Sequence, residues 1–190
     1  NALEIVESLD SDRVIMIPDQ YLAKWVATQT KKEIIYWNGS CEVHERFTGK
    51  ELRDYRRDLK GLVIIAHPEC PEDVLEEADF VGSTAKMSAY VKNKNPAMVL
   101  MVTECSMSDN LAIENPETKF VRPCNLCPHM KKITLDNIRE ALENMSPQIV
   151  IAEAIRGNAR LSVERMIDLG KTHKCNVFYK ANGSGAPRIR

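Results

Sequence analysis

The 190-residue chain lacks three features, each typical of a different class of protein: a charge excess, a membrane-spanning apolar run and a signal peptide. Its formal charge is only −1 at pH 7, so it has no charge excess for binding nucleic acid or an anionic membrane. Its longest apolar runs, such as residues 97–102, are far shorter than the roughly 20 residues that span a bilayer. No signal-peptide pattern is found at its start. We therefore expect a cytoplasmic protein that binds neither nucleic acid nor membrane.

A complete metal-binding motif is also missing, although the chain has six cysteines. Cys124 and Cys127 have the C-x-x-C spacing found in zinc knuckles, iron–sulfur loops and redox dithiols. Zinc needs two further ligands, and there is no second C-x-x-C or H-x₃₋₅-H motif. The pair is therefore compatible with a metal site, a dithiol or two reduced loop cysteines. Cys70, Cys105 and Cys175 have no ligand spacing, and we expect them to be structural.

The alternation of short β runs with helical patterns predicts an α/β protein with parallel sheets and helices on their faces. The strands are expected at residues 14–17, 34–37, 62–66, 80–81, 98–103, 120–121 and 148–152. The helices are expected at residues 1–9, 21–28, 48–59, 71–78, 85–92, 134–143 and 159–169. A hydrophobic content of 44% with 28% charged residues is ordinary for a globular protein of this kind.

The sequence favours two similar small three-layer αβα units, with a boundary at the polar segment 93–96. The first unit is expected at 1–95 and the second at 96–170, followed by a turn-rich tail at 171–190. Each unit has one cysteine loop and one carboxylate at a strand end, Glu69 in the first and Glu104 in the second.

The segment His67-Pro68-Glu69 follows an apolar strand. Open α/β sheets bind ligands at the carboxyl ends of their strands, and a histidine with a nearby carboxylate can transfer protons. The alternative is an ordinary surface loop in which Glu69 precedes the next helix.

Two other loops give weaker signals. Cys41 and His44 stand three residues apart, but a lone cysteine is more often a small buried hydrophobe than a ligand. Ser83 and Thr84, preceded by a glycine, precede a helical pattern and could hold a phosphate or carboxylate, or simply cap that helix.

Taken together and in order, these segments resemble quinolinate synthase, the iron–sulfur enzyme of NAD biosynthesis. The matching pieces are Ile17-Pro18-Asp19-Gln20-Tyr21-Leu22, Trp37-x-Gly39-x-Cys41-x-Val43-His44, His67-Pro68-Glu69-Cys70, Ala78-Asp79-Phe80-Val81-Gly82-Ser83-Thr84, Thr103-Glu104 and Cys127-Pro128-x-Met130-Lys131-Lys132. No single piece is specific, but the combination is.

The resemblance implies a pseudo-threefold enzyme of three α/β domains, in which one cysteine from each domain holds a 4Fe–4S cluster. Three ligands leave one iron open as a Lewis acid. The family condenses iminosuccinate (iminoaspartate) with dihydroxyacetone phosphate to quinolinate, with loss of phosphate and water. An aspartate oxidase or dehydrogenase is the expected source of iminosuccinate.

The family's functional residues can be carried over by motif. Cys41 and Cys127 would be the cluster ligands. Glu69, His67 and His44 would be catalytic. The substrate-binding residues would be His67, Pro68, Glu69, Ser83, Thr84 and Met130.

The chain also departs from the family. The family's N-terminal domain, with its cysteine, is absent from this sequence, so we expect that domain as a partner. Cys124 lies three residues before the expected ligand, and His129 stands where asparagine is expected. A non-catalytic metal or dithiol module built on Cys124 and Cys127 is the alternative function.

Overall fold

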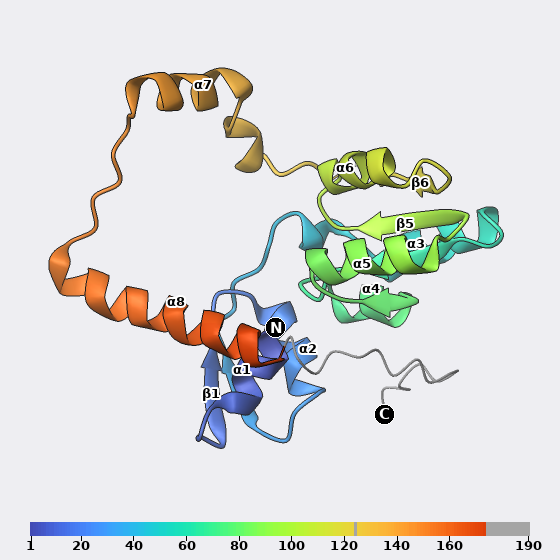
Figure 1. Cartoon of the computed structure of the whole chain (residues 1–190). Helices are drawn as coiled ribbons and strands as arrows, with labels where there is room; N and C mark the ends of the chain where they lie inside the picture. Colours follow the sequence, from blue (N-terminus) through green and yellow to red (C-terminus); the bar gives the residue numbers. More distant parts are fainter. Residues whose placement is uncertain (124, 174–190) are drawn as a thin grey trace. The chain divides into compact units, whose positions relative to one another are not determined.

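The computed structural model describes residues 1–123 and 125–173. Within them the chain separates into two compact units, which are described one at a time. The larger unit comprises residues 10–128, and the smaller one combines residues 1–9 with the chain from residue 129 onward. Strands β1 to β6 all belong to the larger unit (Figure 1).

A four-stranded parallel sheet in the order β4-β3-β5-β6 forms the centre of the larger unit. Its strands are β3 (Val63–Ala66), β4 (Phe80–Val81), β5 (Met98–Val102) and β6 (Lys119–Val121). From β3 the chain continues to β4, which lies on one side of β3 in the sheet. It then crosses to β5, which lies on the other side of β3. The sheet therefore has a topological switch point between β3 and β5, where open α/β sheets form a crevice.

Helices cover both faces of this sheet. They are α3 (Gly49–Asp58), α4 (Glu72–Glu76), α5 (Thr84–Lys94) and α6 (Ser106–Glu114). One core joins side chains of α3 and α4 to one face, and a second joins side chains of α5 and α6 to the other. Because β3 and β5 alternate their residues between the two cores, they are almost wholly apolar, as central parallel strands are. This part of the chain is a three-layer αβα unit.

A smaller parallel sheet pairs β1 (Arg13–Met16) with β2 (Glu33–Tyr36) through α2 (Gln20–Ala27). Asp19 is the N-cap of α2, and its side chain accepts a hydrogen bond from the Leu22 N–H at 2.7 Å. After β2 the chain forms a loop and the 3₁₀ helix η1 (His44–Arg46).

The smaller unit is helical in the part that the structure describes. It contains α1 (Ala2–Ser8), the 3₁₀ helix η2 (Met130–Lys132), α7 (Leu135–Asn144) and α8 (Glu153–His173), and α1 packs against α8.

The predicted α/β class with parallel sheets is confirmed, but some predicted elements are wrong. Residues 148–152 form no strand; Ile149 and Val150 are each 81% exposed, and no strand is hydrogen-bonded to them. Helix α6 was not predicted. Helix α8 begins six residues earlier than expected and continues through Gly170.

The predicted boundary near residue 95 falls between α5 and β5. Strands β3 and β5, which stand on either side of it, are hydrogen-bonded neighbours in one sheet. The division into 1–95 and 96–170 remains a prediction. Most of the predicted tail, including Cys175, lies outside the described residues, as does Cys124.

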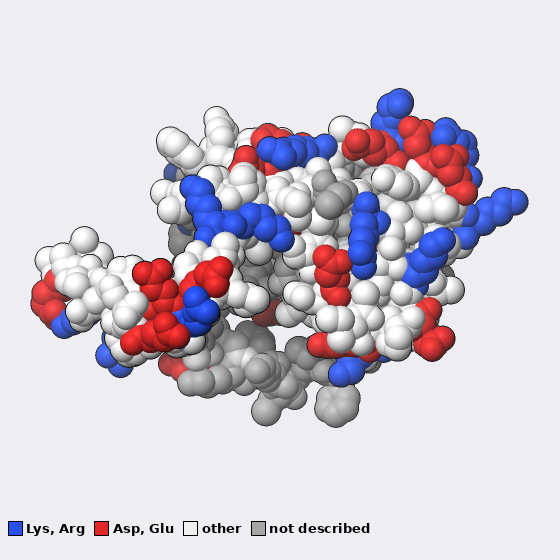
Figure 2. Space-filling view, turned by 90° about the horizontal axis from the view of Figure 1, so that it is seen from above, with Lys and Arg blue, Asp and Glu red and all other residues white. Residues whose placement is uncertain are grey.

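The charged side chains are mixed in sign. On the face in Figure 2, Lys and Arg are interspersed with Asp and Glu, in keeping with the formal charge of −1. Among the described residues, no helix is both long enough and apolar enough to cross a membrane.

Candidate functional site

The site lies where three neighbouring strands of the large sheet end. In the register of the sheet, Ala66 of β3 is opposite Val81 of β4 and Val102 of β5. The segments that follow these residues therefore leave the sheet at one edge. The segment after β3 starts at His67, whose N–H donates to the Val102 carbonyl at 3.2 Å. This hydrogen bond fixes the start of the segment at the switch point between β3 and β5.

Two histidines approach the carboxylate of Glu69. The Nδ1 atom of His44 lies 3.0 Å from Oε2 of Glu69, and Nδ1 of His67 lies 3.6 Å from the same oxygen. The two imidazole rings stack with their centroids 4.6 Å apart. On the other side of the His44 ring, Nε2 lies 2.9 Å from Oγ1 of the buried Thr103.

Burial and mutual charge set the protonation of this group. Burial, assisted by the neighbouring charge of His44, lowers the pKa of His67 to about 4, so its ring is neutral near pH 7. The backbone N–H of Glu69 donates to Nδ1 of His67 at 3.4 Å. A neutral ring that accepts at Nδ1 carries its proton on Nε2. The contact with His44 lowers the pKa of Glu69 despite burial, which favours a carboxylate.

The loop that carries Cys41 is fastened to the start of α2. The Cys41 N–H donates to Oδ2 of Asp19 at 3.0 Å, and the Gln20 N–H donates to the Gly39 carbonyl at 2.8 Å. Glycine is required at position 39 because a Cβ there would lie 2.4 Å from the carbonyl oxygen of Pro18. Burial raises the pKa of Asp19, and the two backbone N–H groups that it accepts from partly offset this effect.

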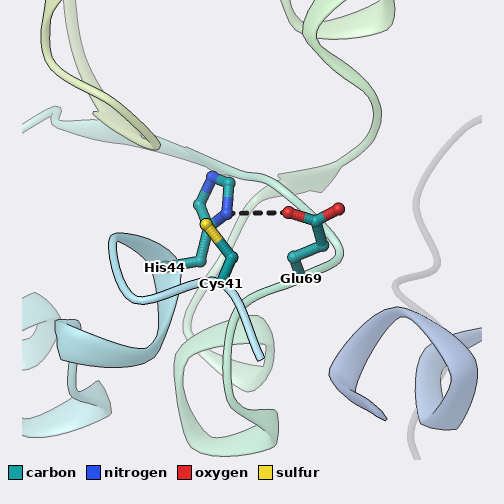
Figure 3. A group of neighbouring side chains, drawn as sticks. All are labelled: Cys41, His44 and Glu69. Atoms are coloured by element: carbon teal, nitrogen blue, oxygen red, sulfur yellow. Dashed lines mark ion pairs between the residues drawn. The ribbon is translucent and has the colours of Figure 1, made fainter. Parts of the chain in front are cut away.

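Cys41, His44 and Glu69 form a group of potential metal ligands (Figure 3). One ligating atom from each lies within 4.8 Å of the others. Cys41 comes from the loop after β2 and His44 begins η1, whereas Glu69 comes from the segment after β3. Figure 3 shows the Cys41 sulfur and the Glu69 carboxylate on either side of the His44 ring nitrogen.

The other cysteines differ in accessibility. Cys127 is partly exposed, as Cys41 is. Its loop is held near α6 by a hydrogen bond from the Cys105 N–H to the Asn125 carbonyl at 3.3 Å. Cys70 is fully buried, and burial raises the pKa of its thiol well above the usual value. Cys70 is therefore a core residue, whereas Cys41 and Cys127 have the accessibility that a ligand of an inorganic cluster needs.

The remaining predicted site residues are in several settings. Pro68 is buried between the two site residues His67 and Glu69. Ser83 is the N-cap of α5, with its hydroxyl accepting from the Lys86 N–H at 3.4 Å, and Thr84 is the exposed first residue of that helix. Met130 is 56% exposed and begins η2 in the smaller unit.

The sequence analysis did not identify Asp19 and Thr103 as site residues. Both follow strands, Thr103 directly after β5 and Asp19 shortly after β1. Both have buried side chains that hold a site residue in place. Their positions after strands could have marked them as site residues. Their partners could not be predicted, because these are distant in sequence.

Most of the chain matches one known protein family. The family model described as quinolinate synthetase A protein matches residues 1–168. The chain is 59% identical over 167 residues to quinolinate synthase 2 of Mesorhizobium japonicum, which covers 88% of this chain and 52% of that protein. It is 54% identical to quinolinate synthase of Agrobacterium fabrum, covering 89% of this chain and 49% of that protein. For quinolinate synthase of Xylella fastidiosa the identity is 51%, with 88% and 49% covered.

The chain thus spans about half the length of the curated relatives that it matches. The match includes the loop of Cys41, the segment from His67 to Glu69 and the loop of Cys127. The chain therefore belongs to the quinolinate synthetase A family of enzymes.

Proposed function

We propose that this chain forms part of a quinolinate synthase that condenses iminosuccinate with dihydroxyacetone phosphate, releasing phosphate and water, in NAD biosynthesis. The observation that carries the proposal is the meeting of His44, His67 and Glu69 beside Cys41 at the switch point of the sheet. Family membership supports it. Because the chain spans about half of its relatives' length, the remaining part of the enzyme is its expected partner.

Glu69 is the proton-transfer residue in this proposal. A carboxylate accepts a proton from a substrate carbon or nitrogen, and the adjacent His44 ring stabilises its charged form. The hydroxyl of Thr103 holds Nε2 of His44, so that Nδ1 is kept toward Glu69. Thr103, His44 and Glu69 thus form a relay. Thr103, at one end, is buried, and Glu69, at the other end, is accessible.

His67 has a different role. Because its Nδ1 accepts from the Glu69 backbone, its Nε2–H is available as a donor to a substrate carboxylate. We propose that Pro68 restricts the backbone between the two side chains, because its ring fixes φ. Ser83 and Thr84 would bind a second carboxylate or phosphate at the start of α5. Met130, which belongs to the smaller unit, would be a further substrate-binding residue.

Cys41 and Cys127 would hold a 4Fe–4S cluster together with a cysteine from the remaining part of the enzyme. Their thiols fit this role because both are partly exposed, whereas Cys70 is sealed in the core. When bound, the cluster would supply an iron without a protein ligand, which acts as a Lewis acid toward substrate oxygens. The remaining chemistry would be carried by Glu69 and His44, which transfer the proton, and by His67, which binds substrate.

The test uses the complete protein. Glu69→Gln should reduce quinolinate formation by about 10²–10⁴-fold, the usual contribution of a general acid–base group, with the visible absorption of the cluster retained. Glu45→Gln is the matched control, because Glu45 is an exposed carboxylate of η1 that accepts hydrogen bonds from the hydroxyls of Tyr21 and Ser40. Near-normal turnover in Glu69→Gln would remove Glu69 from the mechanism.

The ligand assignment has its own test. Cys41→Ala and Cys127→Ala should each lose iron and sulfide, whereas Cys124→Ala should keep both. Retention of the cluster in Cys127→Ala with its loss in Cys124→Ala would reverse the assignment. It would also favour the alternative in which Cys124 is a ligand.

A further inference from the structure

The group Cys41, His44 and Glu69 offers one sulfur, one nitrogen and one oxygen donor. These three atoms lie within 4.8 Å of one another, and the nitrogen and oxygen are 3.0 Å apart. In a tetrahedral zinc site, bond lengths of about 2.0–2.3 Å place neighbouring ligand atoms roughly 3.4–3.6 Å apart. The nitrogen and oxygen would therefore separate slightly around an ion, and the sulfur would close in by about 1 Å.

The Nδ1 atom of His44 is a second, independent sign of a ligand. The side chain is buried, with 7% of the residue exposed, yet within the described part of the chain Nδ1 has no hydrogen bond of good geometry. Among the described residues, Nδ1 lies close to the carboxylate of Glu69, another member of the group. Buried polar atoms are nearly always satisfied, and a metal ion between these atoms would satisfy both.

The group is also accessible. A pocket of about 220 Å³ opens onto it and is lined by Cys41 and Glu69 together with Pro18, Asp19, Trp37, Gly39 and Ser40. The carboxylates of Asp19 and Glu69 in this lining favour entry of a cation. The pocket also has space for a water molecule in a fourth coordination position.

We propose that Cys41, His44 and Glu69 bind one divalent transition-metal ion, for which Zn²⁺ is the best match, when no iron–sulfur cluster occupies Cys41. Zinc accepts thiolate, imidazole and carboxylate ligands together, and three protein ligands with one open position are typical of zinc sites that bind water or substrate. Because cluster and ion both need Cys41, zinc and the cluster exclude each other. The proposal rests on the geometry of the group and does not depend on the reaction of the complete enzyme.

The probe is Co²⁺, whose thiolate complexes absorb in the near ultraviolet and whose visible bands report four-coordination. The 190-residue chain is purified under reducing conditions without iron and stripped with a chelator. Changing Cys124 and Cys127 to serine removes the competing C-x-x-C pair. We expect this double variant to bind one equivalent of Co²⁺ with a charge-transfer band, and Zn²⁺ to displace it.

Three further changes in this background locate the site. Cys41→Ser should abolish the charge-transfer band. Glu69→Gln and His44→Gln should each weaken binding by more than the 10–100-fold that is typical for loss of an outer-shell partner. The glutamine at position 44 can still reach Thr103 but offers no atom at the place of Nδ1. Glu45→Gln, the neighbouring carboxylate, should bind as the parent does.

Several outcomes would overturn the proposal. They are the absence of cobalt binding in the double variant, a charge-transfer band that survives Cys41→Ser, and unchanged affinity in Glu69→Gln. Circular dichroism of each variant separates loss of a ligand from loss of folding. The titration contains no substrate, iron or sulfide, so its failure is distinguishable from failure of the proposed reaction.

Discussion

The imidazole rings of His44 and His67 stack with their planes 12° from parallel, although one follows the small sheet and the other the large sheet. Stacking places both rings against the same carboxylate, Glu69. Burial is the largest cause of the lowered pKa of His67, and the neighbouring charge of His44 is the second.

This lowered pKa makes the stability of the metal-free chain depend on pH. Unfolded His67 takes up a proton below about pH 6.5, whereas in the folded chain it stays neutral down to a pKa of about 4. The unfolded state thus binds more protons in this window, so the free energy of unfolding falls as the pH is lowered through it. The slope is at most about 1.4 kcal/mol per pH unit for one group.

Urea unfolding from pH 7 to pH 4.5 measures this slope. We expect it to be shallower in His67→Asn, which cannot titrate but can still accept the Glu69 N–H. An identical slope in the variant would show that the pKa of His67 is close to its ordinary value.

Thr103→Val is predicted to destabilise the chain by about 1–3 kcal/mol, because it leaves the buried Nε2 of His44 without its partner. Valine has the shape of threonine, so packing is nearly unchanged. Thr103→Ser keeps the hydroxyl and should recover most of this loss in urea unfolding. Equal destabilisation by both variants would mean that packing of the threonine methyl group, and not the hydrogen bond, is responsible.

Gly39→Ala is predicted to be strongly destabilising, because its Cβ would lie 2.4 Å from the Pro18 carbonyl oxygen. Gly157→Ala is the matched control: it lies within α8, and nothing is within 4 Å of an added Cβ. The control should be neutral or raise stability by about 0.5–1 kcal/mol, through helix propensity. Thermal unfolding of both variants tests the pair. A Gly39→Ala variant as stable as the parent would show that the loop can move away from Pro18.

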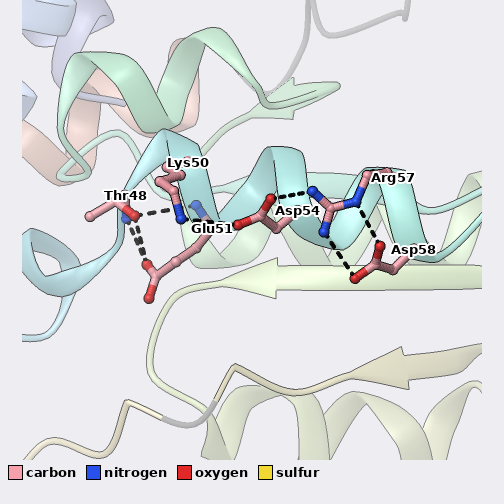
Figure 4. Close-up of polar contacts among 6 residues, drawn as sticks. All are labelled: Thr48, Lys50, Glu51, Asp54, Arg57 and Asp58. Carbon is pink, nitrogen blue, oxygen red and sulfur yellow. Dashed lines mark hydrogen bonds and ion pairs between the residues drawn. The ribbon is translucent and has the colours of Figure 1, made fainter.

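Thr48→Ala is predicted to cost about 1 kcal/mol, because Thr48 and Glu51 form a capping box at the start of α3 (Figure 4). Lys50→Ala in the same turn removes only an exposed ion pair with Asp54. It should cost clearly less than Thr48→Ala, because exposed ion pairs contribute little to stability. Chemical unfolding distinguishes the two, and equal costs would contradict a specific role for the cap.

The sequence predicted the individual strands and segments of this site better than the way they pack together in space. The apolar run before His67 indicated a buried strand, and the placement of His67 and Glu69 at its carboxyl end followed from that. The pairing of β3 with β5, which brings Thr103 to His44, could not be predicted because sheet order depends on contacts distant in sequence.

The errors have physical causes too. Residues 148–152 have the apolar composition of a strand, but a strand needs a hydrogen-bonded neighbour, and none pairs with this segment in the described structure. Helix α6 has Cys105 at its N-cap, and the carboxylate of Glu104 before it accepts from the Ser106 N–H at 2.8 Å. A glutamate two residues before a helix is a weak pattern, and the helix after it was missed.

Because Cys70 is buried, the rate at which its thiol is alkylated reports opening of the fold. Its sulfur is sealed in the core 3.6 Å from the Val102 carbonyl, directly after Glu69, and its raised pKa disfavours the reactive thiolate. An alkylating reagent can therefore modify Cys70 only in molecules in which the carboxyl ends of β3 and β5 have opened. The partly exposed Cys41 is modified without opening. The ratio of the two rates reports how often Cys70 becomes exposed, through local opening of β3 and β5 or through global unfolding.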